Sequence, residues 1–216
     1  MSPAPRRRLA PADRERQILE GAIAYFAEAG FSGSTRELSQ RLGITQPLLY
    51  RYFESKQALV ERVYRTVFEG RWNPQWLVLL QDRRLPLRER LVEFYRQYAA
   101  ATYRPDWIRI YLHAGLSEPS LNQRYIRLVR TQLMPVYCRE VRHACGLPEA
   151  DPPVSEEEIE FVWTLHGGIF YQALRQHVYR TRIRVDFARH VAFVVDNFLA
   201  GAKTVYPRLL ASAGKG

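Results

Sequence analysis

Residues 34–56 read STRELSQRLGITQPLLYRYFESK, and this stretch contains the signals for two short helices separated by a turn. The hydroxyl of Ser34 can cap the first helix, and Glu37 stands where its carboxylate can bond back to the serine N–H in a capping box. Gly43 can adopt the left-handed conformation that ends a helix without a Cβ clash. The pattern predicts a first helix over residues 35–42.

A second helix is predicted to begin directly after Thr45, whose hydroxyl can serve as its N-cap. Proline is tolerated in its first turn because the N–H groups there have no intrahelical acceptor. Leu49 and Phe53 are four residues apart and share the face that packs on the rest of the domain. The outward side chains are those of Gln46, Pro47, Tyr50 and Arg51. A short helix with such a face can enter the major groove of DNA, so the stretch predicts a helix-turn-helix.

The longer segment TRELSQRLGITQPLLYRYFESKQAL resembles the DNA-binding domain of the TetR family of transcriptional regulators. The resemblance extends over about residues 14–67. The shared features are an amphipathic first helix ending in Ala29-Gly30-Phe31, the Thr35-Arg36 start, the leucine-glycine turn, the Tyr50/Tyr52/Phe53 cluster and the Ser55-Lys56 opening of a fourth helix. The resemblance implies a sequence-specific DNA-binding regulator, with repression as the family-level expectation.

Four positions correspond to family residues that read bases. Arg36 suits the paired acceptors of guanine, Gln46 can pair with an adenine edge, and Pro47 and Leu48 can contact a thymine methyl group. Two alternatives stay open, because Arg36 could instead contact phosphate or solvent and Leu48 could simply pack. Family members often carry a small polar residue where this chain has Leu48, so the operator sequence is not determined.

A second set corresponds to residues that hold the DNA backbone without reading sequence. Its hydroxyl and ammonium groups belong to Thr35, Tyr50, Tyr52 and Lys56. We add Arg51 as a phosphate or flank contact, and Thr45 at the start of the second helix of the motif, which we call the reading helix. Burial is the alternative for Tyr52. The basic residues Arg6, Arg7 and Arg8 could form a minor-groove arm, although a disordered basic tail over residues 1–11 is the simpler interpretation.

Composition limits the remaining possibilities. The net charge of +10 is spread over the chain, with twelve basic and eight acidic residues in the first 72, so it permits DNA binding without locating it. No apolar run is long enough for a membrane span, and the first eleven residues do not resemble a signal peptide, so we expect a soluble, cytoplasmic protein. Cys138 and Cys145, with His143 between them, lack the spacing of a zinc site, and neither a metal nor a cofactor is expected.

Helical periodicity covers nearly the whole chain and predicts an all-α fold. We expect a DNA-binding domain over residues 12–70 and a larger helical effector-binding and dimerisation domain over residues 71–216. The predicted helices span residues 14–29, 35–42, 46 onward, 56–68, 87–103, 106–116, 120–144, 156–179 and 186–206. Pro135 should kink the helix that contains it, since it removes a backbone donor. Ser155 and Glu158 predict a second capping box.

The last two predicted helices carry apolar residues over more than one stripe, which predicts one face for internal packing and another for an external partner. Gly167, Gly168 and Gly201 are unfavourable in helices unless a close approach requires them, at about 1 kcal/mol each relative to alanine. The resemblance implies that these helices pair with their copies in a homodimer. Such a dimer would present two reading helices to the half-sites of a near-palindrome about one DNA turn apart.

Large aromatic side chains with a few polar tips are scattered over the second domain and could line a small-molecule cavity. The candidates are Trp76, Tyr103, Trp107, Tyr111, His113, Trp163, His166 and Phe170, with ordinary core packing as the alternative for each. The resemblance implies that an effector bound there releases the DNA. Two rival functions remain: an architectural or recruiting protein without an effector, and a helical enzyme, for which no known catalytic motif is present.

Overall fold

The computed structural model describes residues 10–213, and all regular structure in that range is helical. The N-terminal helices are α1 Pro11–Ala29, α2 Thr35–Leu42, α3 Gln46–Tyr52 and α4 Lys56–Val67. They are followed by η1 Glu69–Arg71, α5 Gln75–Gln81, α6 Leu87–Thr102, α7 Pro105–Ser117, α8 Pro119–Leu128, η2 Val129–Leu133, α9 Met134–Ala144, α10 Glu156–His177 and α11 Phe187–Ala213. The expectation of an all-α fold is confirmed.

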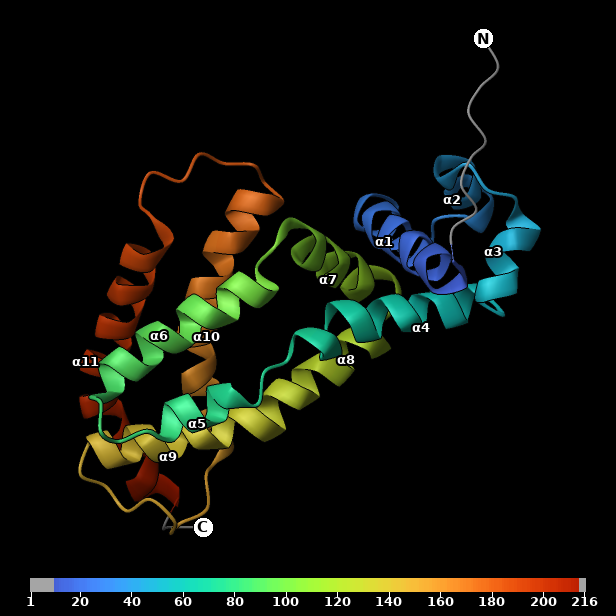
Figure 1. Cartoon of the computed structure of the whole chain (residues 1–216). Coiled ribbons are helices and arrows are strands. Elements are labelled where there is room, and N and C mark those ends of the chain that lie inside the picture. Colours follow the sequence, from blue (N-terminus) through green and yellow to red (C-terminus); the bar gives the residue numbers. More distant parts are fainter. Residues whose placement is uncertain (1–9, 214–216) are drawn as a thin grey trace.

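The molecule is elongated, with α1, α2 and α3 at one end and α10 and α11 at the other (Figure 1). Helix α4 leads from the first group toward the second, and α1 packs on both α4 and α7. Helix α3 packs on an apolar core shared by the four N-terminal helices. The side chains of this core are almost completely buried, and they include Ile18, Leu38, Leu49, Leu59 and Val63. The small N-terminal group therefore has its own apolar core and also rests on the larger part.

The turn between α2 and α3 follows the sequence closely. Gly43 has φ 62° and ψ 33°, which is the left-handed conformation expected of it, and Thr45 caps α3 through Leu48 N–H. The predicted capping box at α2 is only half present. Ser34 accepts from Glu37 N–H at 3.1 Å, but the carboxylate of Glu37 turns to the hydroxyl of Tyr25 on α1 and to the guanidinium of Arg41, one turn further along α2.

The predicted continuous helix over residues 120–144 is broken into α8, η2 and α9. Pro135 lies in the first turn of α9, directly after the π-helical segment η2. Proline lacks an N–H and clashes with the preceding turn, and a π-helical segment absorbs that mismatch. The expected disturbance occurs, but just before the proline. The short helix α5, which buries Trp76 and Leu80, was not predicted.

Helices α10 and α11 pack against each other at one edge of the molecule. At Gly168 an added Cβ would lie 3.2 Å from Val194 of α11, so the close approach at this glycine is made within the chain. The second capping box is complete, with Ser155 and Glu158 bonded reciprocally. Glu158 also holds the fully buried Arg142 at 2.6 Å. Within residues 10–213, no helix is both long and apolar enough to cross a membrane.

Candidate nucleic-acid interface and effector cavity

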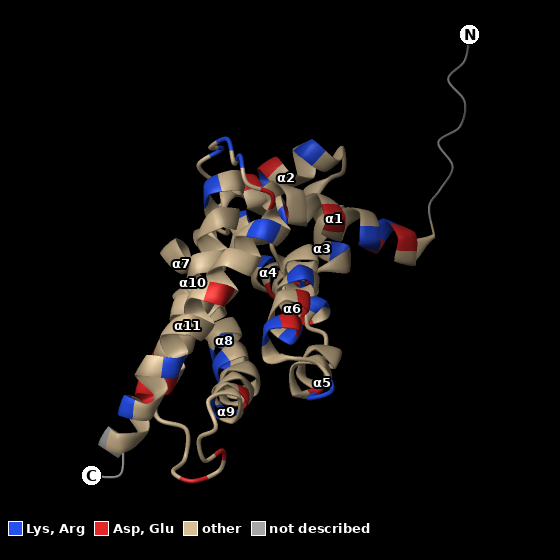
Figure 2. Cartoon of the chain, turned by 90° about the vertical axis from the view of Figure 1, so that its left-hand side faces the viewer, with Lys and Arg blue, Asp and Glu red and all other residues tan. Residues whose placement is uncertain are grey.

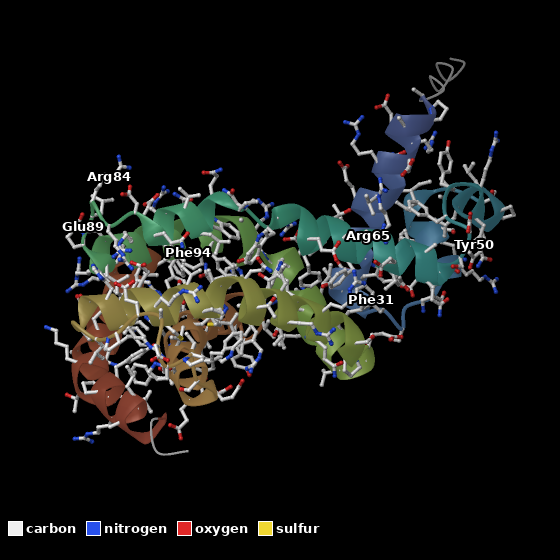
Figure 3. The ribbon with its side chains drawn as sticks, turned by 90° about the horizontal axis from the view of Figure 1, so that it is seen from below. Phe31, Tyr50, Arg65, Arg84, Glu89 and Phe94 are labelled. Atoms are coloured by element: carbon white, nitrogen blue, oxygen red, sulfur yellow. The ribbon has the colours of Figure 1, made fainter. Side chains whose placement is uncertain are left out.

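Helix α3 presents one face to the core and the other to solvent. Leu49 and Phe53 are buried, whereas Pro47, Tyr50 and Arg51 are exposed. Tyr50 lies at the far end of the molecule in Figure 3, away from the bulk of the larger part. Within residues 10–213, two side chains of this exposed face, Gln46 and Tyr50, form hydrogen bonds to α2.

Those contacts meet at the hydroxyl of Thr35, the first residue of α2. Gln46 Nε2 donates to Thr35 Oγ1 at 2.9 Å, and the hydroxyl of Tyr50 lies 2.9 Å from the same oxygen. Thr35 is buried, while Tyr50 remains 39% exposed. An amide and a phenol are therefore oriented by a third group before any DNA is present, which reduces the entropy lost when they bind.

The other predicted DNA contacts are distributed as follows. Arg36, Thr45 and Arg51 are exposed, and neither arginine forms an ion pair with any described residue. Leu48 and Lys56 are half-buried, and so is Tyr52, for which burial had been the alternative. The three residues Arg6, Arg7 and Arg8 lie outside the described part of the chain, as does most of the proposed arm over residues 1–11.

A polar cluster that sequence patterns did not indicate joins α2 to α1. The hydroxyl of Tyr25 donates to Glu37 at 3.0 Å, and Arg41 bridges Glu37 at 3.0 Å and Glu28 at 2.7 Å. The Arg41 guanidinium also lies 4.9 Å from the centre of the Tyr25 ring. The pair Glu37–Arg41 has the i,i+4 spacing of one helix face, but Tyr25–Glu37 and Arg41–Glu28 are twelve or more positions apart, so only the fold reveals the contacts with α1. This cluster fixes the angle between α2 and α1.

Residues 18–63 match the sequence profile described as "Bacterial regulatory proteins, tetR family". This range covers most of α1, the whole helix-turn-helix and most of α4. The chain belongs to the TetR family. The family places it among DNA-binding transcriptional regulators rather than enzymes.

A curated relative agrees with the family. The chain is 28% identical over 102 residues to the HTH-type transcriptional repressor KstR2 of Mycolicibacterium smegmatis, in an alignment that covers 47% of this chain and 49% of that protein. The match thus spans only about half the length of that relative. It supports the family without transferring the relative's full activity.

Solved structures share the complete fold. A TetR-like transcriptional regulator from Rhodococcus sp. RHA1 superposes with a TM-score of 0.65 at 21% identity, over 90% of this chain and all of that one. A TetR-family regulator from Mesorhizobium loti superposes with a TM-score of 0.60 at 16% identity, over 90% and 98% of the two chains. At such identities the likeness concerns the fold alone.

In this TetR-family chain, aromatic side chains from α7, α8 and α10 surround a cavity of about 140 Å³. Its lining consists of Trp107, Tyr111, Tyr125, Ile126, Val129, Trp163, His166, Gly167 and Phe170. We name it the aromatic cavity. Trp107 and Tyr111 stack with their ring centres 5.0 Å apart and 9° between planes, and Phe170 meets Tyr111 edge-on at 5.7 Å.

The structure brings together five of the eight predicted effector contacts and separates three. Trp76 is a core residue packed edge-on against Phe94, because α5 turns it inward. Tyr103 is buried beside the cavity residues but does not line it. His113 faces α1, where its Nδ1 would lie 3.1 Å from a Cβ added at Gly30. Residues 125, 126, 129 and 167 were missed, and helical spacing from a predicted contact could have found only Gly167.

His166 is the one titratable group with nitrogen in the cavity wall. Its Nδ1 lies 3.4 Å from the hydroxyl of Tyr95, and which of the two atoms donates depends on the tautomer of the imidazole. Burial lowers the pKa of His166 to about 4, because desolvation disfavours the imidazolium form. The imidazole is therefore neutral at physiological pH.

Phe68, at the C-terminal end of α4, contacts the cavity wall from behind. Its ring centre lies 5.2 Å from that of Trp107, 5.5 Å from Tyr125 and 6.3 Å from Tyr111. It also stacks on Tyr64 of α4 at 5.0 Å. The helix that begins at the predicted DNA contact Lys56 therefore ends against three side chains of the aromatic cavity.

A cluster of charged residues on the surface joins α8 to α4 and to η1, which follows α4. Arg124 of α8 binds Glu61 at 2.8 Å and Glu69 at 2.7 Å, and its guanidinium lies 4.3 Å from the centre of the Tyr64 ring. The Arg124 guanidinium, with help from Arg65, lowers the pKa of Glu61. Helices α4 and α8 are thus held together by ion pairs outside and aromatic rings inside.

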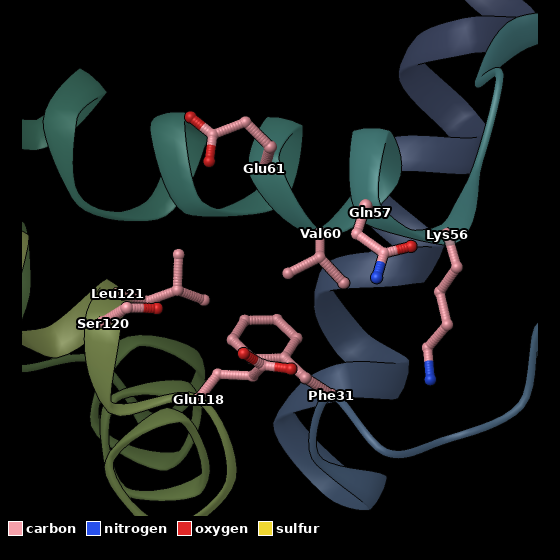
Figure 4. A pocket seen from close by; sticks show the side chains of 8 residues that line it. All are labelled: Phe31, Lys56, Gln57, Val60, Glu61, Glu118, Ser120 and Leu121. Atoms are coloured by element: carbon pink, nitrogen blue, oxygen red, sulfur yellow. The ribbon is translucent and has the colours of Figure 1, made fainter.

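A second hollow of about 290 Å³ lies where α4 meets the start of α8 (Figure 4). Phe31, Val60 and Leu121 form its apolar part, and its charged residues are Lys56, Glu61 and Glu118. Its mixed lining and position between the two parts of the chain distinguish it from the aromatic cavity. Movement of α4 against α8 would change its shape.

Proposed function

We propose that this chain is a homodimeric transcriptional repressor that binds a near-palindromic DNA operator and is released by a small molecule. The observation that carries the DNA-binding part is the convergence of Gln46 and Tyr50 on the Thr35 hydroxyl. It holds one base-reading amide and one phosphate-binding phenol on the exposed face of a helix-turn-helix. Repression is proposed because KstR2 is named a repressor.

In this proposal residues 12–70 form the DNA-binding domain and residues 71–216 the effector-binding and dimerisation domain. Arg36, Gln46, Pro47 and Leu48 contact bases, while the backbone is held by Thr35, Thr45, Tyr50, Arg51, Tyr52 and Lys56. The protein would act in the cytoplasm. Charge supports binding only generally, since arginines also cluster on the connection between α10 and α11 (Figure 2).

Dimerisation through α10 and α11 is supported by exposed apolar side chains. Tyr171, Tyr179 and Phe193, on these helices or just beyond them, are 52%, 58% and 53% exposed. Large aromatic residues that remain open to solvent on neighbouring elements mark an interaction surface. A two-fold axis beside them would place two copies of α3 on one side of the dimer.

Release by an effector requires that the small molecule bind the DNA-incompetent arrangement more tightly than the competent one. The aromatic cavity is the proposed site because Phe68 connects its wall directly to α4. A guest that moves Trp107 or Tyr125 would shift the end of α4 and with it the reading helix. Reciprocity then demands that DNA weaken effector binding by the same factor.

The test of DNA binding is a selection of bound sequences from random duplexes, followed by affinity measurements across salt concentrations. A near-palindrome with half-sites about one helical turn apart is the expected winner. Non-specific binding that salt abolishes, with no enriched sequence, would contradict a sequence-specific regulator. The selected duplex then serves as the probe for effector release.

One observation favours a second candidate, a DNA-binding architectural protein without an effector. The aromatic cavity holds about 140 Å³, whereas sites for drug-sized ligands are commonly about 300–1,000 Å³. If small aromatic molecules neither bind the chain nor change its operator affinity, this second function is preferred. Binding of such a molecule with loss of DNA affinity would exclude it.

A further inference from the structure

The aromatic cavity has a lining without a permanent charge. Its nine residues include no carboxylate, ammonium or guanidinium group, and the only titratable nitrogen base is His166, which is neutral. A charged guest would lose its hydration without gaining an opposite charge, which is costly in an apolar site. The chemistry of the wall therefore selects an uncharged molecule.

Size and shape restrict the guest further. A cavity of about 150 Å³ lined by apolar side chains holds benzene in another protein, and the aromatic cavity is of similar volume, about 140 Å³. Its walls include the flat faces and edges of Trp107, Tyr111 and Phe170. Aromatic rings prefer offset stacking or edge-to-face contacts with one another. A single flat ring fits both the volume and the walls.

The wall of the aromatic cavity contains nitrogen groups that can donate a hydrogen bond. His166 lines the cavity, and when the hydroxyl of Tyr95 donates to its Nδ1, the imidazole proton is on Nε2, where it can be donated to a guest. The indole N–H of Trp107 is a buried donor without a partner in the same range. The hydroxyl of Tyr125 is already engaged with that of Tyr98 at 2.5 Å. A guest that forms a hydrogen bond with these N–H donors must carry an acceptor.

We infer that the aromatic cavity binds small uncharged aromatic compounds with a carbonyl or similar acceptor, and that Nε2–H of His166 donates to it. This inference names the chemical class of the effector and rests on the proposed function only for the consequence of binding. The binding itself is a property of the chain and can be measured without DNA.

The experiment titrates three probes of matched size into the purified full chain by calorimetry. Acetophenone has a ring and a carbonyl, ethylbenzene has the ring alone, and benzoate has the ring with a negative charge. We expect acetophenone to bind about fivefold more tightly than ethylbenzene, as one neutral hydrogen bond provides, and benzoate not to bind at the same concentrations. Equal affinities for the first two, binding of benzoate, or no binding of any probe would overturn the inference.

Two variants identify the donor. His166→Phe keeps an aromatic side chain without an N–H, so acetophenone should bind no better than ethylbenzene, with ethylbenzene affinity retained. His166→Gln keeps an N–H near the position of Nε2 and should restore much of the preference. A preference for acetophenone that survives in His166→Phe would refute the role of His166. Retained ethylbenzene binding shows that each variant is folded.

A parallel measurement separates this inference from the proposed function. Acetophenone is added to the complex of the chain with its selected duplex. Binding to the chain with the stated preference, but without any change in DNA affinity, would uphold the ligand class and reject the effector role. Effector release by another compound, with no probe bound in the aromatic cavity, would uphold the proposed function and reject the ligand class.

Discussion

At the scale of single residues, the interface depends on one hydroxyl with two partners. Thr35 Oγ1 lies 2.9 Å from both Gln46 Nε2 and the hydroxyl of Tyr50. Gln46 can exchange this bond for a base edge, whereas Tyr50 can accept from the Thr35 hydroxyl and donate its own O–H to a phosphate oxygen. The two residues should therefore respond differently to substitution.

Gln46→Ala should alter base preference at one position in each half-site. The expected loss at the preferred base is about 1–3 kcal/mol per bidentate contact, with little change at other positions. Repeating the random-duplex selection with the variant measures this directly. An unchanged consensus with uniformly weaker binding would remove Gln46 from the base-reading set.

Tyr50→Phe should weaken binding to all sequences alike, by about 0.5–1.5 kcal/mol, because it deletes a hydroxyl and leaves the ring. Affinities for the selected duplex and for a scrambled duplex are compared at one salt concentration. Tyr103→Phe is the matched control, since that hydroxyl lies outside α1–α4 and has no hydrogen-bond partner among residues 10–213. A change in sequence preference for Tyr50→Phe would contradict the phosphate-binding role.

His166 should make the fold sensitive to mild acid. Its pKa is about 4 in the folded chain and about 6.5 when unfolded, so the unfolded chain binds more protons between these values. Stability should therefore fall as pH decreases from about 6.5 to 4, by up to about 3 kcal/mol from this group. Denaturant unfolding of the parent and of His166→Phe gives the difference. Parallel pH profiles for the two proteins would show that His166 is not protected from protonation.

At the scale of elements, α4 is the connection between reading helix and cavity. It begins at Lys56 and ends against Phe68, whose ring touches three cavity residues. The ion pairs of Arg124 lie on the surface and contribute at most about 1 kcal/mol each. The buried rings are thus the better candidate for transmitting a movement.

Phe68→Leu should reduce the effect of a bound effector on operator affinity more than it reduces operator affinity itself. The leucine cannot contact Trp107, Tyr111 and Tyr125 together, so movement of the cavity wall would reach α4 less completely. Operator affinity is measured with and without saturating effector. Phe94→Leu is the control, because Phe94 is equally buried and contacts Trp76 and Tyr98 outside the cavity. Equal loss of response in both variants would point to general destabilisation.

At the scale of the whole molecule, the proposed function depends on two copies acting together. Two linked DNA-binding domains can bind about 10²–10⁴-fold more tightly than one domain alone. The exposed aromatic residues of α10 and α11 are the proposed surface for the second copy. A monomer would keep the contacts of one half-site and lose this gain.

Phe193→Asp should convert the dimer to a monomer and weaken operator binding by about 100-fold or more, because it places a charge in an apolar contact. Sedimentation velocity and operator affinity are measured on the same samples. Val78→Asp changes an apolar residue that is 60% exposed on α5 and should leave both unchanged. A dimeric Phe193→Asp protein with normal affinity would exclude this surface.

The sequence by itself determined the local structure. Caps at Ser34, Thr45 and Ser155 and the left-handed Gly43 depend on interactions within a few residues, and these were predicted correctly. The family resemblance followed from the spacing of residues in one short segment, and the all-α fold followed from helical periodicity along the chain. Such features are readable because neighbours in sequence are also neighbours in space.

Only the tertiary structure decided which distant residues meet. It directed Glu37 to Tyr25, placed Trp76 in the core and His113 against α1, and brought α8 into the wall of the aromatic cavity. The aromatic residues of α6, α7 and α10 look alike in sequence because helical period defines a buried face but not the neighbour that covers it. Which faces enclose a cavity depends on the angles between helices, and those are set by packing over the whole chain.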